Sequence, residues 1–283
     1  MRVAVLGMGH MGKAFAARAL ERNHLVTVWN RTPGKAHDLT AKGAVEASSP
    51  EGAVVGSDVV LVVLADDAAV LEVCLGDEGA LPSLGPTAVM ANISTVSPET
   101  VRRLATAGPE GRVLDSPVMG SPAAIAVGRG SFLIGGPSTT VEALQPLWTD
   151  LGAGYTYCGP VGAAATMKLV SNLLLMTGVT ALAEGIATAR SNGIPDELLK
   201  GVLADSFVVS PASKVRLDSL FDSAHPGWFS PSLARKDVRL AIDLAQQAGV
   251  EVRVGPATEE LLTRVIDAGG EWPDFAAVIE AFS

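Results

Sequence analysis

Short runs of apolar residues alternate with longer mixed stretches through the first 160 residues of the chain. These runs read as strands, and they are "RVAVLG", "LVTVWN", "DVVLVVLA", "TAVMANIS", "RVLDSPV" and "SFLIGG". Nearly continuous apolar runs of this length are typical of strands that are buried on both faces of a parallel sheet. The pattern predicts an α/β domain of the Rossmann type, a doubly wound parallel sheet, over residues 1–160.

The hydrophobic pattern changes after residue 160. The segment "AAATMKLVSNLLLMTGVTALAEGIATARSNGI" contains no proline before Pro195 and predicts a single helix of about thirty residues. Further helical patterns cover 196–206, 232–249 and 256–268, whereas the stretch 208–232, rich in Gly, Pro and Ser, predicts a loop. We therefore expect an all-helical second domain over residues 161–283, joined to the first domain by the long helix.

Composition and charge exclude several classes of partner. A net charge of -9 argues against nucleic acid, whose phosphates require a basic surface. The uncharged part of the long helix, residues 169–183, is too short and too polar to cross a membrane. Cys74 and Cys158 suggest neither a disulfide framework nor a metal cluster, and we expect no metal. With no signal-peptide pattern at the start, the sequence predicts a cytoplasmic protein that acts on a small molecule.

The first predicted strand runs directly into "GMGHMG", and a helix follows. Gly7, Gly9 and Gly12 have the spacing of a dinucleotide-binding loop, where they allow a tight turn, the approach of pyrophosphate and close packing of helix on strand. The strand and helix on either side supply the context that this short motif requires. The predicted cofactor contacts also include the other residues of the loop: Met8, His10 and Met11. We interpret His10 as a loop residue rather than a catalyst.

The second predicted strand ends in "VWNRTPGK". Proteins that bind NAD commonly place an acid here for the ribose hydroxyl, and that carboxylate would repel a 2′-phosphate. Asn30 removes this repulsion, Arg31 can pair with the phosphate, and Thr32 and Lys35 add a hydroxyl and a charge. The segment therefore predicts NADP(H) as the cofactor, the alternative being a solvated basic turn.

Ligands in such sheets bind beyond the carboxyl ends of the strands. Three more strand ends therefore become candidates: Leu64, Ala65 and Asp66; the segment from Asn92 to Thr95; and the segment from Asp115 to Ser121. We expect Ser94 and Thr95 to contact the cofactor. They and Ser97 are also suited to cap the following helix, a role that is compatible with binding.

Lys168 and Asn172 lie four residues apart, so they project from one face of the long helix. One interpretation is a lysine that extends to solvent beside a surface asparagine. The other is that Lys168 donates a proton to a carbonyl oxygen that receives hydride, with the substrate oriented by Asn172.

Over essentially its full length the chain resembles the β-hydroxyacid dehydrogenase family, which includes 3-hydroxyisobutyrate dehydrogenases and glyoxylate/succinic semialdehyde reductases. The resemblance rests on "GMGHMG", "NIST", "DSPVMGS", "GPVGAAATMKLVSN" and "KDVRLA", in that order. It implies that Lys168 is the catalytic acid/base and that Asn172 orients the substrate. It also implies that Thr95 lies near the nicotinamide, that Met119, Gly120 and Ser121 form the substrate segment, and that Lys236 with Asp237 closes the site.

Three residues depart from the family pattern. Met119 stands where the family commonly has a serine that holds the substrate carboxylate, which favours a non-acid or bulkier carbonyl substrate. Ala164 replaces a glycine of the catalytic segment, and Asn92 replaces an aspartate; we expect both to be tolerated.

Two alternative functions remain open. Imine reductases resemble the same architecture, and an apolar Met119 favours them, whereas Lys168 beside Asn172 favours carbonyl reduction. The other alternative is a non-catalytic NADPH-binding sensor. Members of the family are usually dimers or tetramers, so the resemblance implies a homodimer or homotetramer.

Overall fold

The computed structural model describes residues 1–282. The chain divides into two compact units, Met1–Lys168 and Leu169–Ser283. The first unit contains a sheet with helices, and the second contains helices only within the described residues. The predicted combination of a Rossmann-type sheet, a long helix and a C-terminal helical domain is confirmed.

A nine-stranded sheet organises the first unit, in the order β3-β2-β1-β4-β5-β6-β8-β7 with β9 beside β8. The strands are β1 (Arg2–Leu6), β2 (Leu25–Trp29), β3 (Val45–Glu46), β4 (Val59–Val62), β5 (Val89–Asn92), β6 (Val113–Asp115), β7 (Val118–Met119), β8 (Ser131–Gly135) and β9 (Tyr155–Gly159). From β3 to β6 all pairs are parallel. The predicted parallel sheet is present over these strands, and at its far end β8 runs antiparallel to β6 and β7.

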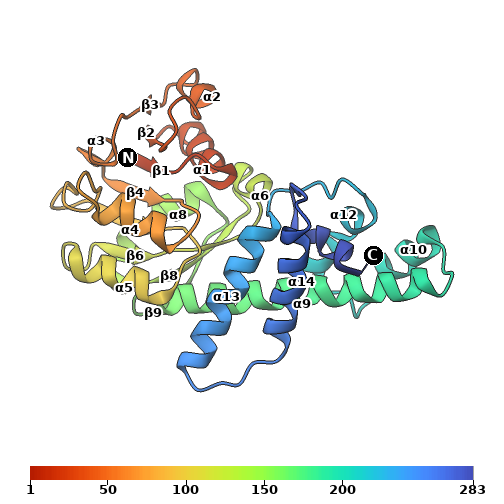
Figure 1. The fold of residues 1–283 in the computed structure, drawn as a ribbon. Helices are drawn as coiled ribbons and strands as arrows, with labels where there is room; N and C mark the ends of the chain where they lie inside the picture. Colours follow the sequence, from red (N-terminus) through yellow and green to blue (C-terminus); the bar gives the residue numbers. More distant parts are fainter. Residues whose placement is uncertain (283) are drawn as a thin grey trace. The chain divides into compact units, whose positions relative to one another are not determined.

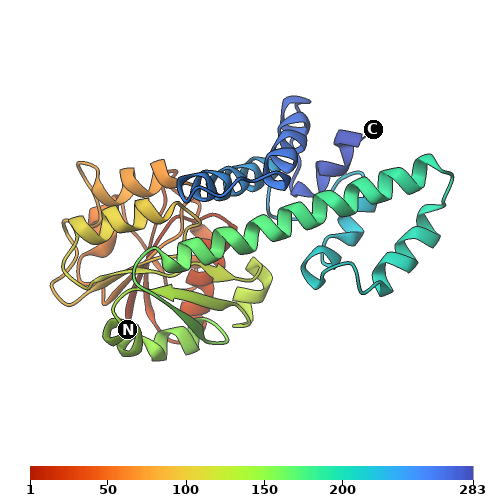
Figure 2. The same ribbon diagram turned by 90° about the horizontal axis from the view of Figure 1, so that it is seen from below.

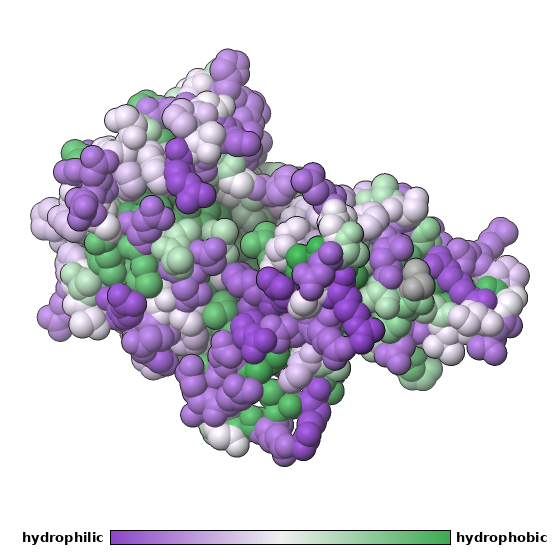
Figure 3. All heavy atoms as spheres, in the orientation of Figure 1, coloured by the Kyte–Doolittle hydropathy of each residue, from purple (hydrophilic) through white to green (hydrophobic). Residues whose placement is uncertain are grey.

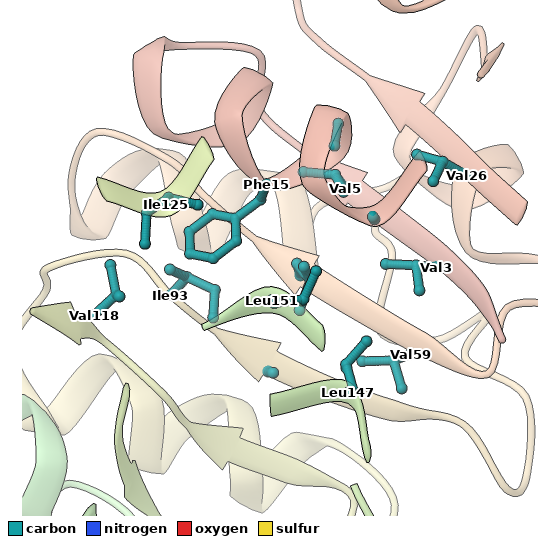
Figure 4. Packing of buried hydrophobic residues seen from close by; sticks show 14 of the residues in the cluster. Val3, Val5, Phe15, Val26, Val59, Ile93, Val118, Ile125, Leu147 and Leu151 are labelled. Atoms are coloured by element: carbon teal, nitrogen blue, oxygen red, sulfur yellow. The ribbon is translucent and has the colours of Figure 1, made fainter. Parts of the chain in front are cut away.

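Alternate residues of the central strands pack into two separate hydrophobic cores, one on each face of the sheet. Val3 and Val5 face one core with α1 (His10–Glu21), α2 (His37–Thr40), α6 (Pro122–Ala126), α7 (Ser138–Ala143) and α8 (Gln145–Leu151). Ala4 and Leu6 face the other core with α3 (Pro50–Val54), α4 (Asp67–Leu75) and α5 (Pro98–Ala107). Figure 2 shows helices on both faces of this sheet, and Figure 4 shows Phe15 of α1 pointing into the first core. A sheet covered on both faces has its strand ends as the accessible edge for a ligand.

Helix α9 (Ala163–Ser191) is a single helix of 29 residues that begins in the first unit and continues in the second. By length and composition alone it could cross a membrane, contrary to our expectation from its uncharged part. One such helix is weak evidence, since core helices of soluble proteins meet the same criterion. Met176, Val179 and Ile186 of α9 are fully buried in the core of the second unit.

The second unit packs helices around that part of α9. They are α10 (Asp196–Asp205), α11 (Pro211–Lys214), α12 (Leu217–Phe221), α13 (Pro231–Gln247), α14 (Val254–Asp267) and the 3-10 helix η1 (Phe275–Phe282), several of which are labelled in Figure 1. The predicted loop over 208–232 is wrong in part, because α11 and α12 lie within it. Ser210 caps α11, with Pro211 as its first residue, and these turn-forming residues start a short helix here instead of a loop.

Candidate active site

The three glycines of the loop differ in the space around them. A Cβ on Gly7, whose φ is +104°, would lie 2.2 Å from the carbonyl oxygen of Val63, and a Cβ on Gly12 would lie 1.8 Å from that of Gly7. A Cβ on Gly9 would meet nothing within 4 Å. Gly7 and Gly12 therefore allow the tight turn and the close packing of helix on strand, while Gly9 leaves the open space that a pyrophosphate requires. The residues present fit a dinucleotide.

Asn30 ties the end of β2 to this loop. Its Oδ1 accepts a hydrogen bond from the backbone N–H of Met8 at 3.0 Å, and its Nδ2 donates to the carbonyl of Thr32 at 3.0 Å. The sequence suggested only that Asn30 avoids repelling a phosphate. In the structure Asn30 also links the glycine loop to the turn that carries Arg31, because it bonds to both.

The turn after β2 is exposed to solvent. Arg31, Thr32 and Lys35 are all exposed, and Figure 3 shows a mainly hydrophilic surface around α2, which follows this turn. The N–H of Gly34 donates to Oε1 of Glu46 at 2.9 Å, which attaches the tip of the turn to β3. The basic groups are thus carried on a braced turn beside the glycine loop, where a ligand can reach them.

The ends of β4 and β5 are joined by Ser94. Its Oγ donates to the carbonyl of Val62 at 3.1 Å and accepts from the N–H of Leu64 at 2.8 Å, so the hydroxyl is already engaged. Asp66 caps α4 through the N–H of Ala69, and Ser97 caps α5. Because β1, β4 and β5 are parallel neighbours, these ends lie at the same edge of the sheet as the glycine loop.

The predicted cofactor residues of the glycine loop and of the strand ends differ in their exposure to solvent. Gly7, Met8, Gly12 and Ser94 are buried; Met11, Asn30, Leu64, Asp66 and Thr95 are half-buried; and Gly9, His10 and Ala65 are exposed.

Met119 and Lys168 meet in the first unit. Lys168 lies in the second turn of α9 and is half-buried, and its Nζ is 4.0 Å from Sδ of Met119 at the end of β7. Gly120 follows with φ +147°, which is a left-handed conformation that favours glycine, and Ser121 then caps α6. The structure thus brings the predicted catalytic lysine against the predicted substrate segment.

Asn172 belongs to the second unit, and it is bonded to Asp237 on α13. Asn172 Nδ2 donates to Asp237 Oδ2 at 2.6 Å, and Lys236 Nζ lies 2.8 Å from Asp237 Oδ1. Asn172 and Asp237 are both buried. The predicted "KD" pair is therefore partly a device that fixes the side chain of Asn172.

Asp115 is the residue whose role sequence reasoning missed. Its place at a strand end predicts contact with a ligand, but its side chain is fully buried. Its Oδ2 accepts from the N–H groups of Gly162 and Ala165 at the start of α9, at 3.1 and 2.8 Å. Burial raises the pKa of this carboxyl to about 6, although the backbone N–H groups of α9 and the charge of Arg102 lower it.

The two cysteines, Cys74 and Cys158, differ in burial. Cys74 is buried in the first unit, where burial raises the pKa of its thiol to about 12, and Cys158 is half-buried on β9. Within residues 1–282, no group of three His, Cys, Asp or Glu side chains is placed to hold a metal ion.

Two family models together match almost the whole chain. Residues 2–159 match the NAD binding domain of 6-phosphogluconate dehydrogenase, and residues 162–282 match the NAD-binding domain of NADP-dependent 3-hydroxyisobutyrate dehydrogenase. The chain belongs to the β-hydroxyacid dehydrogenase family. It is an NAD(P)-binding oxidoreductase of the type that acts on CH–OH groups.

Curated members of this family align with the chain from end to end. Glyoxylate/succinic semialdehyde reductase 1 of Arabidopsis thaliana is 32% identical and covers 99% of this chain and 98% of its own length. The NAD-dependent L-serine dehydrogenase of Pseudomonas aeruginosa is 29% identical, with 99% and 97% covered. Small hydroxy acids and semialdehydes are thus the substrates that the family implies.

Solved structures agree with this β-hydroxyacid dehydrogenase fold. The structure of Psf3 in complex with NADP+ and 2-OPP is 26% identical, has a TM-score of 0.88, and covers 99% of this chain and all of its own. An imine reductase from Myxococcus stipitatus in complex with NADP+ is 21% identical, with a TM-score of 0.68 over 100% of each chain. The second likeness concerns the fold alone and relates the family structurally to imine reductases.

Proposed function

We propose that this β-hydroxyacid dehydrogenase reduces a small carbonyl compound with NADPH, using Lys168 as the proton donor. The observation that carries the proposal is the contact between Lys168 Nζ and Met119 Sδ at 4.0 Å. It supports the proposal because it sets an ammonium group beside the segment that the family uses for substrate. A lysine that only extended to solvent would keep its ammonium group in water rather than beside a thioether.

The chemistry follows from the charge that develops during reduction. When bound, the reduced nicotinamide supplies a hydride to the carbonyl carbon. The ammonium of Lys168 neutralises the negative charge that grows on the carbonyl oxygen and then transfers a proton to it. In the reverse direction the neutral amine of Lys168 takes the proton from the hydroxyl. In this proposal Asn172, held by Asp237, orients the substrate, and Lys236 contributes to binding.

NADPH is the proposed cofactor because of the residues after β2. The side chain of Asn30 is neutral and already bonded to Met8 and Thr32, so no acid repels a 2′-phosphate there. The exposed guanidinium of Arg31 forms a planar fork that suits a phosphate, with Thr32 and Lys35 beside it. The similar L-serine dehydrogenase of Pseudomonas aeruginosa is NAD-dependent, so this preference is tested by comparing NADPH with NADH.

Met119 restricts the proposed substrate class. A thioether is a weak acceptor and has no donor for a carboxylate, unlike the serine common at this position. We therefore propose a substrate whose carbonyl does not require a carboxylate bound at residue 119. The same apolar side chain, together with the shared fold, favours an imine reductase as the second candidate function. A non-catalytic NADPH sensor is the third candidate.

The assembly that we propose is a homodimer or homotetramer. Large apolar side chains of the second unit are exposed, among them Phe207 at 96%, and also Leu174, Leu198, Val202, Val208 and Val215. Such surface is unusual on a monomer and is typical of subunit contacts. We also propose a cytoplasmic location.

A panel of substrates separates the candidate functions. We would follow NADPH and NADH oxidation by absorbance with glyoxylate, succinic semialdehyde, neutral ketones and cyclic imines. The proposal expects NADPH-dependent reduction of at least one carbonyl compound. Turnover of imines alone would establish the second candidate, and NADPH binding without oxidation by any compound would establish the sensor.

A further inference from the structure

The first turn of helix α9 has no capping side chain of its own. The N–H groups in the first turn of a helix need acceptors from outside it, and usually the residue before the helix supplies one. Here that residue is Gly162, which has no side chain. Its φ is +95°, and a Cβ there would lie 3.0 Å from the guanidinium of Arg102. Because of this positive φ, a capping residue such as serine or aspartate would be strained at this position.

Asp115 supplies the missing acceptor from the middle of the sheet. It ends strand β6, where it pairs in register with Asn92 of the parallel strand β5 and with Gly135 of the antiparallel strand β8. Its Oδ2 accepts from both Gly162 and Ala165, which are 47 and 50 positions away in the sequence. A carboxylate at this end of a long helix also interacts favourably with the helix dipole.

The position of Lys168 depends on this attachment. Ala165 precedes Lys168 by three residues, which is less than one turn of helix. A displacement of the first turn therefore moves Lys168 directly, and an error of about 1 Å in a reacting group can cost about 100-fold in rate. We propose that Asp115 is a positioning residue that sets where Lys168 stands by holding the first turn of α9 against β6. This inference rests on the proposed role of Lys168.

The carboxyl group cannot itself act on a substrate, because its side chain is fully buried. The charged or titratable groups that act on it are Arg102 of α5 and Cys158 of β9. Its pKa of about 6 lies in a range that kinetic assays can reach. Asp115 Oδ1 has no hydrogen-bond partner among the described residues, so it is the atom free to take the proton. Protonation would leave Oδ2 as a neutral acceptor, which forms weaker hydrogen bonds than a carboxylate.

Two substitutions separate a positioning role from a structural one. Asp115→Asn keeps one carbonyl acceptor and removes the charge, whereas Asp115→Ala removes the cap. We expect the NADPH single-turnover rate of Asp115→Asn at about pH 8 to match that of the wild type at about pH 5, as both hold a neutral acceptor. The wild-type rate should fall as the pH drops through about 6. The rate of Asp115→Asn should lack this step, and that of Asp115→Ala should be lower by a further tenfold or so.

The controls distinguish failure of this inference from failure of the proposed function. Asp150 of α8 is the ion-pair partner of Arg22 and His24. Asp150→Asn should lower the melting temperature without altering the pH profile of the single-turnover rate. If both Asp115 variants lose stability but Asp115→Asn keeps the wild-type rate and profile, Asp115 is only structural and the inference is wrong. If Lys168→Ala is as fast as the wild type, the proposed function itself is wrong. The isosteric Asp115→Asn carries the test if Asp115→Ala does not fold.

Discussion

Asn172 donates from Nδ2 to Oδ2 of Asp237 at 2.6 Å, and this bond joins helix α9 to helix α13 inside the second unit. Both side chains are buried, and the other oxygen of Asp237 pairs with Lys236 at 2.8 Å. The bond fixes which way the amide of Asn172 points, since a carboxylate can accept only from its NH2 end. The amide oxygen of Asn172 is thereby turned away from Asp237.

Removing the charge of Asp237 should therefore impair the orientation of Asn172. We expect Asp237→Asn to lower kcat/KM for the carbonyl substrate about 30-fold, equivalent to the roughly 2 kcal/mol of a hydrogen bond to a charged group. The dissociation constant for NADPH should be unchanged. Asp243→Asn, a carboxylate lost from the same helix, is the matched control for steady-state kinetics. An unchanged kcat/KM in Asp237→Asn would contradict the proposed role of Asn172.

The glycine loop predicts opposite outcomes for two neighbouring substitutions. Gly9→Ala adds a methyl group to open space, so the melting temperature should hold while NADPH affinity falls about tenfold or more. Gly12→Ala would place a Cβ 1.8 Å from the carbonyl oxygen of Gly7, so the protein itself should lose stability. Thermal melts and fluorescence titration with NADPH measure both effects. Normal NADPH binding by Gly9→Ala would mean that the phosphates do not approach at Gly9.

Cofactor preference should depend on Arg31. We expect Arg31→Ala to raise KM for NADPH about 30-fold and to leave KM for NADH within about twofold, because only NADPH carries the 2′-phosphate. Arg129→Ala is a matched control, as it removes an arginine from outside the turn after β2. Equal increases in KM for NADPH and NADH would show that Arg31 does not bind the 2′-phosphate.

Local patterns were enough to predict much of this fold. The apolar runs became β1, β2, β4, β5, β6 and β8, and the segment free of proline became the 29-residue helix α9. The direction of β8, which lies between β6 and β7, was not predictable in this way, because an apolar run looks the same in parallel and antiparallel pairs. Within 208–232, the Ser210-Pro211 pair that starts α11 is also typical of a loop, so the sequence does not distinguish the two.

The candidate site was predictable only where a motif lies in one continuous stretch. The glycine loop, Met119 and Lys168 could be named in this way. The bonds of Asp115 to α9 and of Asn172 to Asp237 span 47 to 65 positions. No spacing rule connects side chains that far apart, and a buried carboxylate at a strand end reads in sequence like one that faces a ligand.

Asp115 also predicts a pH dependence of stability. Its pKa in the folded protein, about 6, lies above the ordinary value of 3.8. Its contribution to stability is therefore fully present below pH 3.8 and is lost as the pH rises through about 6. The shift corresponds to about 3 kcal/mol.

A variant that cannot titrate reveals this contribution. The unfolding free energy of the wild type should gain up to about 3 kcal/mol relative to Asp115→Asn between about pH 8 and pH 4. Urea unfolding of both proteins across this range measures the difference, and the other carboxylates cancel in the comparison. A difference that stays constant with pH would show that the pKa of Asp115 is not raised.

The proposed role of Lys168 is tested by the single-turnover rate of NADPH oxidation by Lys168→Ala, measured with a carbonyl compound that the wild type reduces. We expect a loss of about 100-fold or more, as general acids contribute this much, with NADPH affinity unchanged. Met167→Ala, a substitution at the neighbouring exposed position of α9, should keep the wild-type rate. A Lys168→Ala protein that binds NADPH and turns over as fast as the wild type would contradict the central claim.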